Sequence, residues 1–283
     1  MDEERLASLP RTRRLSRYGT LAQLRRDDLT EAGVVLHLDG VEQSHVESDD
    51  PGWLLHDYTL RIAAVLDALG MGDSVLHLGA GALTLPRWIE HRATERGMSQ
   101  PQQTVLDIEP ELVDFVLHAL PMQNPPRSVV ADAAIALAPG GHLHRHRYDV
   151  VVVDLFNSAD APESITGDTF CRDLAAAVSD EGLLVVNLGD DANLRFARRQ
   201  VTRLVQQAAD DDWTRCLLTA PQNVIASETE GNLVFAAGPH SLPSRALETV
   251  WAAGPHPGEV LTGAELRQWT HGPGSANHTR VEP

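Results

Sequence analysis

The stretch at residues 74–82, SVLHLGAGA, indicates how this chain folds. Its first five residues predict a short strand, and the turn that follows contains Gly79 and Gly81. A Gly-x-Gly turn between a first strand and a helix lets the backbone approach a nucleotide closely, and the N–H groups at the helix start can face an anion. The same glycines can also form a tight turn with no ligand.

Strands and helices alternate on both sides of this stretch. Residues 53–69 are apolar at helical spacing, with Asp50-Pro51 as a start signal and Gly70 as a stop signal. The alternation predicts a parallel sheet with helices on both faces, and the valines at 150–153 predict a central strand buried on both sides. Further strands are expected at 104–108, 128–130, 182–188, 215–219 and 232–237, the last two as an antiparallel edge, with helices through Arg92 and at 110–119, 133–137, 169–178 and 193–208.

The two ends of the chain have a different pattern. Residues 20–25 and 34–38 predict a β-hairpin, and 41–46 can continue as a strand after the Asp39-Gly40 turn. The charged residues 1–17 are expected to be mobile. Beyond Gly238, helices are expected near 245–253 and 263–270, and the final dozen residues are expected to be disordered.

Composition narrows the class of protein. The chain has 283 residues, of which 42% are hydrophobic and 22% charged, as in an ordinary globular protein. The net charge of −17 argues against a nucleic-acid partner; it fits a cationic substrate, or simply aids solubility. With neither a bilayer-length apolar run nor a signal peptide, we expect a cytoplasmic protein with no membrane partner. Cys171 and Cys216 are expected to be reduced, partly buried thiols.

Acidic residues follow the next three strands of the predicted parallel sheet. Asp107 and Glu109 end the second strand, where an acid can bind both ribose hydroxyls, and Thr84 in place of a third glycine favours a mononucleoside over a dinucleotide. Asp132 can accept the exocyclic amine of an adenine or simply cap a helix. Asp154 follows four valines, where it is either a strand cap or a functional carboxylate. Together these residues predict an adenosine site with one carboxylate left for chemistry.

Several segments resemble the spermidine synthase (polyamine aminopropyltransferase) family. Residues 38–43, LDGVEQ, are similar to the family's LDGVxQ segment, and Tyr58 falls where the family has a substrate-side tyrosine. The glycine turn, Asp107-Ile108-Glu109, Asp132-Ala133 and the strand from Tyr148 to Asp154 resemble the family's donor-binding and catalytic motifs, and Pro162-Glu163-Ser164 resembles a proline-alanine-glutamate-serine segment.

The resemblance implies a fold, an activity and roles for individual residues. The fold would be Rossmann-like, of the S-adenosylmethionine-dependent methyltransferase type, with an N-terminal β-hairpin. We divide the chain into residues 1–50 (tail and hairpin), 51–240 (nucleoside-binding catalytic domain) and 241–283 (C-terminal extension). The activity would be aminopropyl transfer from decarboxylated S-adenosylmethionine, a co-substrate and not a permanently bound cofactor, to putrescine or a related amine, in a homodimer. Asp154 would be the general base with Tyr58 beside it, and the donor would be bound by Gln43, Gly79, Gly81, Asp107, Ile108, Asp132 and Ala133.

The chain departs from the family on the amine side. Ala82 stands where the family has the aspartate that holds the donor's ammonium, Asn157 replaces a second aspartate, and Thr59 replaces a glutamine. Asp160 can replace part of the lost charge. A late tyrosine is not visible at 221–226. Two alternatives therefore stay open, a methyltransferase that uses intact S-adenosylmethionine and a catalytically silent nucleoside-binding homologue.

The thirteen histidines raise the question of a metal site. His142, His144 and His146 alternate in one predicted loop, but no cysteine or carboxylate nearby completes a ligand set. An exposed polar loop explains them, and no metal is expected.

Overall fold

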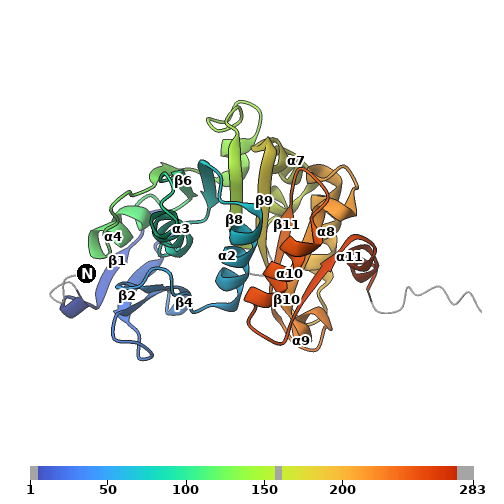
Figure 1. The fold of residues 1–283 in the computed structure, drawn as a ribbon. Coiled ribbons are helices and arrows are strands. Elements are labelled where there is room, and N and C mark those ends of the chain that lie inside the picture. Colours follow the sequence, from blue (N-terminus) through green and yellow to red (C-terminus); the bar gives the residue numbers. More distant parts are fainter. Residues whose placement is uncertain (1–5, 157–160, 273–283) are drawn as a thin grey trace, which may run out of the picture.

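The computed structural model describes residues 6–156 and 161–272, which form two sheets (Figure 1). The strands are β1 Arg11–Arg14, β2 Leu21–Arg26, β3 Gly33–Leu38, β4 Val41–Glu47, β5 Ser74–Leu78, β6 Gln102–Asp107, β7 Arg127–Val130, β8 Tyr148–Phe156, β9 Val178–Asp190, β10 Cys216–Pro221, β11 Gly231–Ala237 and β12 Gly258–Thr262. The helices are α2 Asp57–Leu69, α3 Thr84–Glu95, α4 Leu112–Ala119, α5 Ala133–Leu137, α6 Glu163–Thr166, α7 Asp168–Ala176, α8 Arg195–Ala208, α9 Gln222–Ile225, α10 Ser244–Ala253 and α11 Gly263–Thr270.

The central sheet has eight strands within the described residues, in the order β12-β10-β11-β9-β8-β5-β6-β7. The five strands from β9 to β7 are parallel, and β11, β10 and β12 are antiparallel. The chain leaves β5 toward β6 and β7 and then returns to the other side of β5 as β8. The order therefore reverses between β5 and β8, the position where open α/β sheets bind ligands at the carboxyl ends of their strands.

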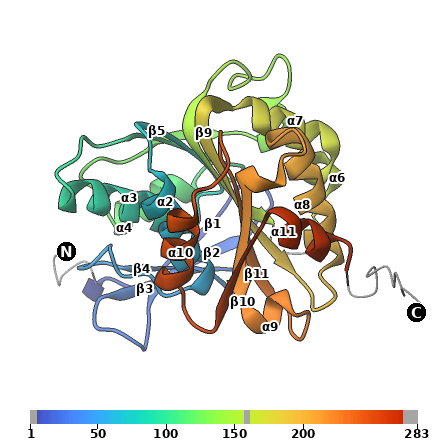
Figure 2. The same cartoon turned by 45° about the vertical axis from the view of Figure 1, so that its right-hand side comes forward.

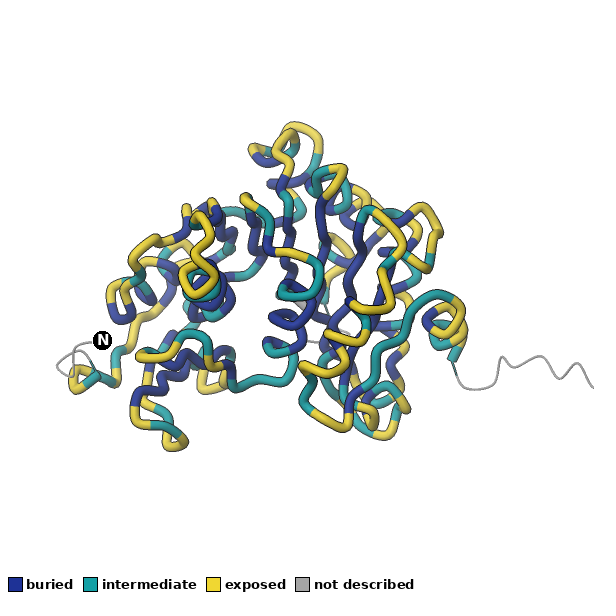
Figure 3. Tube along the Cα trace, viewed as in Figure 1, coloured by how far each residue is buried: buried dark blue, intermediate teal, exposed yellow. Residues whose placement is uncertain are grey.

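Helices cover both faces of this sheet, as the alternating pattern predicted (Figure 2). Along β8, Val150 and Val152 pack into a core with α2, α3 and α10, while Val151 and Val153 pack into a core with α5, α7 and α8. The strand is thus buried on both faces, as its run of valines predicted. Figure 3 shows the central strands buried and the outer turns of the helices exposed.

The N-terminal region is larger than the hairpin that the sequence predicted. Strands β2 and β3 form that hairpin, and β4 is the further strand expected at 41–46. The unpredicted β1 completes a four-stranded antiparallel sheet. The expectation that residues 1–17 are mobile was wrong for β1 and for Leu15, which is fully buried. The side chains of β1 are largely exposed, so backbone pairing with β2 holds this strand in place without the apolar pattern that predicts one.

Other boundaries also differ from the sequence pattern. The helix expected from residue 53 begins at Asp57, and the one-turn helix α9 separates β10 from β11. Both helices expected after Gly238 are present, but the edge strand β12 between them was missed. The final residues expected to be disordered lie mostly outside the described part. No helix in the described ranges is both long and apolar enough to cross a bilayer.

Candidate active site

The glycine turn after β5 lies against the end of β8. Gly79 has φ +97°, and a Cβ atom built there would lie 2.5 Å from the backbone oxygen of Asp154. Gly81 has φ +47°, and its Cβ would lie 2.3 Å from Oγ of Ser44. These positions need glycine both for the left-handed backbone and for the close approach of neighbouring atoms. The turn thus brings the β5–α3 backbone to the carboxylate-bearing end of β8.

Asp154 lies at the base of this region with both carboxylate oxygens bonded. Oδ1 accepts a hydrogen bond from Nδ2 of Asn187 at 2.9 Å, and Oδ2 accepts one from the Tyr58 hydroxyl at 3.3 Å. Burial raises the pKa of Asp154, and the donors Asn187 and Tyr58 and the nearby His56 oppose that rise. A carboxylate with a raised pKa and donors on both oxygens is suited to accept a proton.

A narrow cavity connects Asp154 with the glycine turn. Its walls include Tyr58, Thr59, His77, Ser44 and backbone of the turn, and its volume is about 30 Å³. This is room for about one water molecule. Burial lowers the pKa of His77 to about 4, and its Nε2 lies 2.9 Å from Oε1 of Gln103, so this wall is neutral near pH 7.

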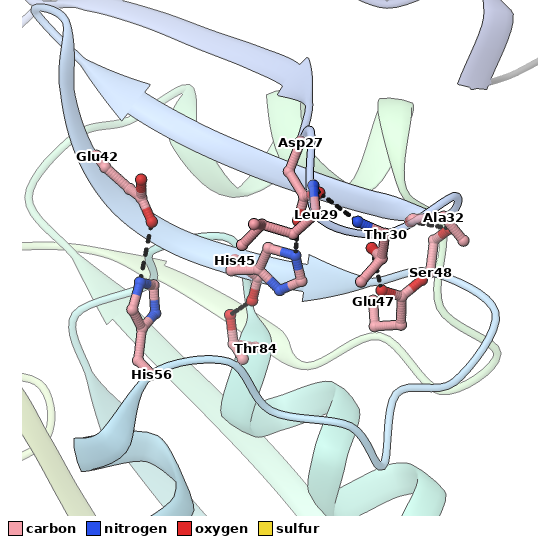
Figure 4. A network of polar contacts seen from close by, with 10 residues as sticks. All are labelled: Asp27, Leu29, Thr30, Ala32, Glu42, His45, Glu47, Ser48, His56 and Thr84. Carbon is pink, nitrogen blue, oxygen red and sulfur yellow. Dashed lines mark hydrogen bonds and ion pairs between the residues drawn. The ribbon is translucent and has the colours of Figure 1, made fainter.

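Glu42, on β4, extends the polar contacts around Asp154 through the ring of His56. Nε2 of His56 lies 3.0 Å from Oε1 of Glu42 (Figure 4), and the His56 ring stacks on that of Tyr58 with centroids 5.8 Å apart. The Tyr58 hydroxyl then donates to Asp154. The N-terminal sheet and α2 therefore set the position of the hydroxyl that contacts the carboxylate.

A buried contact within the N-terminal sheet and two hydrogen bonds hold this sheet beside the glycine turn. Nε2 of His45 and Oδ2 of Asp27 are in contact, and both side chains are almost wholly buried (Figure 4). The backbone oxygen of His45 accepts a hydrogen bond from Thr84, the first residue of α3, at 2.8 Å. Ser44 Oγ accepts another from the N–H of Ala82 at 3.1 Å. Strand β4 is thus attached to the end of the turn that leads into α3.

The predicted nucleoside side lies along the ends of β6 and β7. Asp107 accepts the N–H groups of Ala80 and Glu109, each at 2.9 Å, so its carboxylate supports the turn. Burial raises the pKa of Glu109, a hydrogen bond from the Arg17 backbone opposes that rise, and its Oε2 is a buried atom without a hydrogen-bond partner in the described structure. Asp132 caps α5 by accepting the N–H groups of Ala134 and Ile135.

The structure brings together only part of the predicted site. Gly79, Gly81, Tyr58 and Asp154 line the 30 Å³ cavity, whereas Asp107, Asp132, Gln43, Ile108 and Ala133 are not among its walls. Gln43 is half-buried on β4, Ile108 follows β6 and is also half-buried, and Ala133, the first residue of α5, is buried in the core.

The residues that depart from the family pattern are placed as follows. Ala82 is fully buried with its N–H bonded to Ser44, and Thr59 lines the cavity while its hydroxyl donates to the His56 backbone. Residues 221–226 form the end of β10 and α9. Asn157 and Asp160 lie outside the described residues.

Three side chains around Asp154 were not predicted from the sequence. Asn187 is the single polar residue within the buried run LLVVNL of β9, and such an interruption is a signal that could have found it. His56 and Ser44 come from segments distant in sequence from Asp154, and no spacing connects them to it.

The three alternating histidines do not meet at one point. His144 Nδ1 lies 3.2 Å from the backbone oxygen of Leu137, while the ring of His146 stacks on Tyr148. Among the residues that the structure describes, no three histidine, cysteine or acidic side chains are grouped as metal ligands.

Comparisons with known proteins find a curated sequence relative and similar folds. No family model matches the chain. A polyamine aminopropyltransferase of Neisseria meningitidis serogroup A is 29% identical over 165 residues, which are 56% of this chain and 59% of the relative. The chain therefore matches about three-fifths of the length of that curated relative.

Solved structures show the same fold over a longer stretch. The crystal structure of a probable spermidine synthase from Corynebacterium glutamicum superposes with a TM-score of 0.75, at 21% identity, over 93% of this chain and 94% of that one. Human methyltransferase-like protein 13 in complex with SAH gives 0.52 at 16% identity, over 80% and 98%. The fold is thus the Rossmann-like fold of S-adenosylmethionine-dependent methyltransferases, as predicted. In sequence and in fold, this chain is thus similar to members of the spermidine synthase family.

Proposed function

We propose that this chain transfers an aminopropyl group from decarboxylated S-adenosylmethionine to an amine such as putrescine. In this reaction an amine nitrogen attacks the carbon next to the sulfonium and loses a proton to Asp154. The carbon–sulfur bond breaks, and its electron pair stays on the sulfur of the departing methylthioadenosine. Orientation of the amine behind a good leaving group supplies much of the rate.

The observation that carries this proposal is the unpaired acceptor beside Asp154. Oδ1 of Asn187 is buried and has no hydrogen-bond partner in the part of the chain that the structure describes, while Nδ2 of the same amide holds Asp154. Buried polar atoms are nearly always paired, so an orphan acceptor next to a candidate base favours a ligand that donates hydrogen bonds. An alkylammonium has three such donors, and it can donate to Asn187 and Asp154 together.

A second buried acceptor without a partner supports the binding of a nucleoside on the other side of the glycine turn. Oε2 of Glu109 is buried and has no partner in the described ranges, and a ribose hydroxyl is a donor that would satisfy it. Since the cavity at Asp154 measures about 30 Å³, binding of a whole donor requires its walls to move apart. We therefore expect the donor to change the conformation of the segments that carry Ser44 and Tyr58.

A methyltransferase that uses intact S-adenosylmethionine is the second candidate. Its support is Ala82, which is fully buried where the family carries the aspartate for the donor's ammonium. Without that aspartate, nothing at this position repels the additional carboxylate of the intact donor. A silent nucleoside-binding protein is the third, and the expected homodimer stays a prediction.

Calorimetric titration with both donors and with methylthioadenosine distinguishes these candidates. We expect the decarboxylated donor to bind more tightly than the intact one, because the described cavity walls include the acidic Asp154 and no arginine. A preference for the intact donor would favour the methyltransferase. Absence of binding by all three nucleosides would reject the proposed donor site.

Replacement of Tyr58 by phenylalanine tests the contact with Asp154. The hydroxyl donates to the ionised carboxylate, so its loss should raise the pKa of Asp154 further. We expect the acidic limb of the pH–rate profile to move to higher pH, with turnover at its plateau reduced about tenfold or less. A pH profile identical to that of the unaltered chain would show that Tyr58 does not act on Asp154.

A further inference from the structure

A second cavity lies over the outer side of α8, with none of its walls shared with the Asp154 cavity. Its volume is about 760 Å³, which is within the range of small-molecule sites. One wall is α8, and the opposite wall includes Ser227 after α9 and Thr270–Gly272 at the end of α11.

The charge of this cavity is opposite to that of the chain. Its walls include four arginines of α8 and His271, and no aspartate or glutamate among the described residues. The whole chain has a net charge of −17. The arginines are Arg195, Arg198, Arg199 and Arg203, whose spacing places them on one side of the helix.

Two of these arginines are fixed by the protein. Arg198 donates to the backbone oxygens of Trp269 and Asn193 and to the hydroxyl of Ser227, and its guanidinium lies over the Trp269 ring. Arg203 donates to the backbone oxygen of Thr166 and pairs with the exposed Asp168. These contacts hold two guanidinium groups at the wall.

The other two, Arg195 and Arg199, are exposed and have no side-chain hydrogen bond or ion pair to any other residue in the described ranges. They lie at i and i+4, where like charges repel, and they lie near the helix N-terminus, where the macrodipole is already positive. The first turn of α8 contains no acidic residue, although the carboxylate of Asp190, before the helix, accepts the N–H of Ala197. The two unpaired guanidinium groups repel each other, and a bound anion would relieve that repulsion.

We propose that this cavity binds a compound with a phosphate or diphosphate group. Guanidinium groups donate two parallel hydrogen bonds to phosphate oxygens, and fixed and free arginines on one wall suit an anion with more than one charged group. The hydroxyls of Ser227 and Thr270 offer further donors on the opposite wall. The chain's large negative charge disfavours a nucleic acid as the source of the phosphates.

The test is calorimetric titration of the whole chain with sodium pyrophosphate, with sodium sulfate at equal ionic strength as the reference. We expect pyrophosphate to bind, Arg199→Gln to weaken it about tenfold, and Arg195→Gln with Arg199→Gln to abolish it. Arg245→Gln is the matched control, because Arg245 is also an exposed arginine in the first turn of a helix, α10.

Three results would overturn the proposal: no heat with pyrophosphate, equal affinity in the double variant, or equal weakening by Arg245→Gln. Binding of a single-stranded oligonucleotide without binding of pyrophosphate would also overturn it, in favour of a nucleic-acid surface. The replaced side chains are exposed, so thermal unfolding should show the variants folded. Because the two cavities share no residue, the outcome is independent of the donor titration.

Discussion

The Asp154→Asn variant should lose turnover by a factor of about 10² to 10⁴ while it unfolds at the same temperature as the unaltered chain or higher. The loss follows because an amide cannot take the proton of the attacking amine. The geometry can survive, since the amide oxygen can accept from Asn187 and the amide N–H₂ can donate to the Tyr58 hydroxyl oxygen.

The stability of this variant follows from the sign of the pKa shift. Burial raises the pKa of Asp154 in the folded chain, so the folded state binds its proton more tightly than the unfolded state does. The ionised carboxylate therefore costs stability once the pH exceeds the unfolded pKa, and this cost is fully present above the folded pKa. Removing the charge removes the cost at pH 7. Calorimetric unfolding across the pH range measures it.

Asp149→Asn is the matched control, at the other end of the same strand. Desolvation there is outweighed by hydrogen bonds from Ser74, Asp73 and Ser179, which lower the pKa of Asp149. Its stabilisation is present above the unfolded pKa and is lost as the pH falls through the folded pKa. At pH 7 we expect Asp149→Asn to lower stability by about 1–3 kcal/mol and to leave turnover per folded molecule unchanged. Full turnover in Asp154→Asn would remove Asp154 from the reaction.

The sequence predicted the central sheet well because its signals are local. A run of valines, a glycine turn and alternation with amphipathic helices all reflect burial against immediate neighbours. Strands β1 and β12 were missed for the opposite reason. RTRR and GEVLT pair at sheet edges through their backbones, and their side chains are mostly half-buried or exposed. No apolar alternation marks such strands.

The site was predicted less completely than the fold. The neighbourhood of Gly79 and Asp154 follows from the order of parallel strands, because carboxyl ends of adjacent strands meet at one edge. Asn187, His56 and Ser44 reach Asp154 or the turn only through tertiary packing of β9, α2 and β4. The position of Asp132 at the start of α5 was predictable. It lies away from the cavity because β7, which precedes it, is two strands from β5 in the sheet.

Gly79→Ala should lower the stability of the chain and suppress turnover, because the new side chain meets both backbone strain and a steric clash. A side chain at φ +97° costs about 1–3 kcal/mol wherever it occurs. The added Cβ would also lie 2.5 Å from the Asp154 backbone oxygen, which cannot rotate away as a side chain can. We expect a total loss of about 4 kcal/mol or more, measured by denaturant unfolding.

Gly140→Ala separates the effect of backbone strain from the effect of the steric clash. Gly140 has φ +92°, close to that of Gly79, but a Cβ there meets no atom within 4 Å. It should therefore show the backbone cost alone and keep full turnover. The difference between the variants measures the contact between the glycine turn and β8, and a shift of Asp154 by about 1 Å would cost about 10² in rate. If the two variants lost equal stability and kept equal turnover, the close packing of Gly79 against Asp154 would have no role in holding the carboxylate in place.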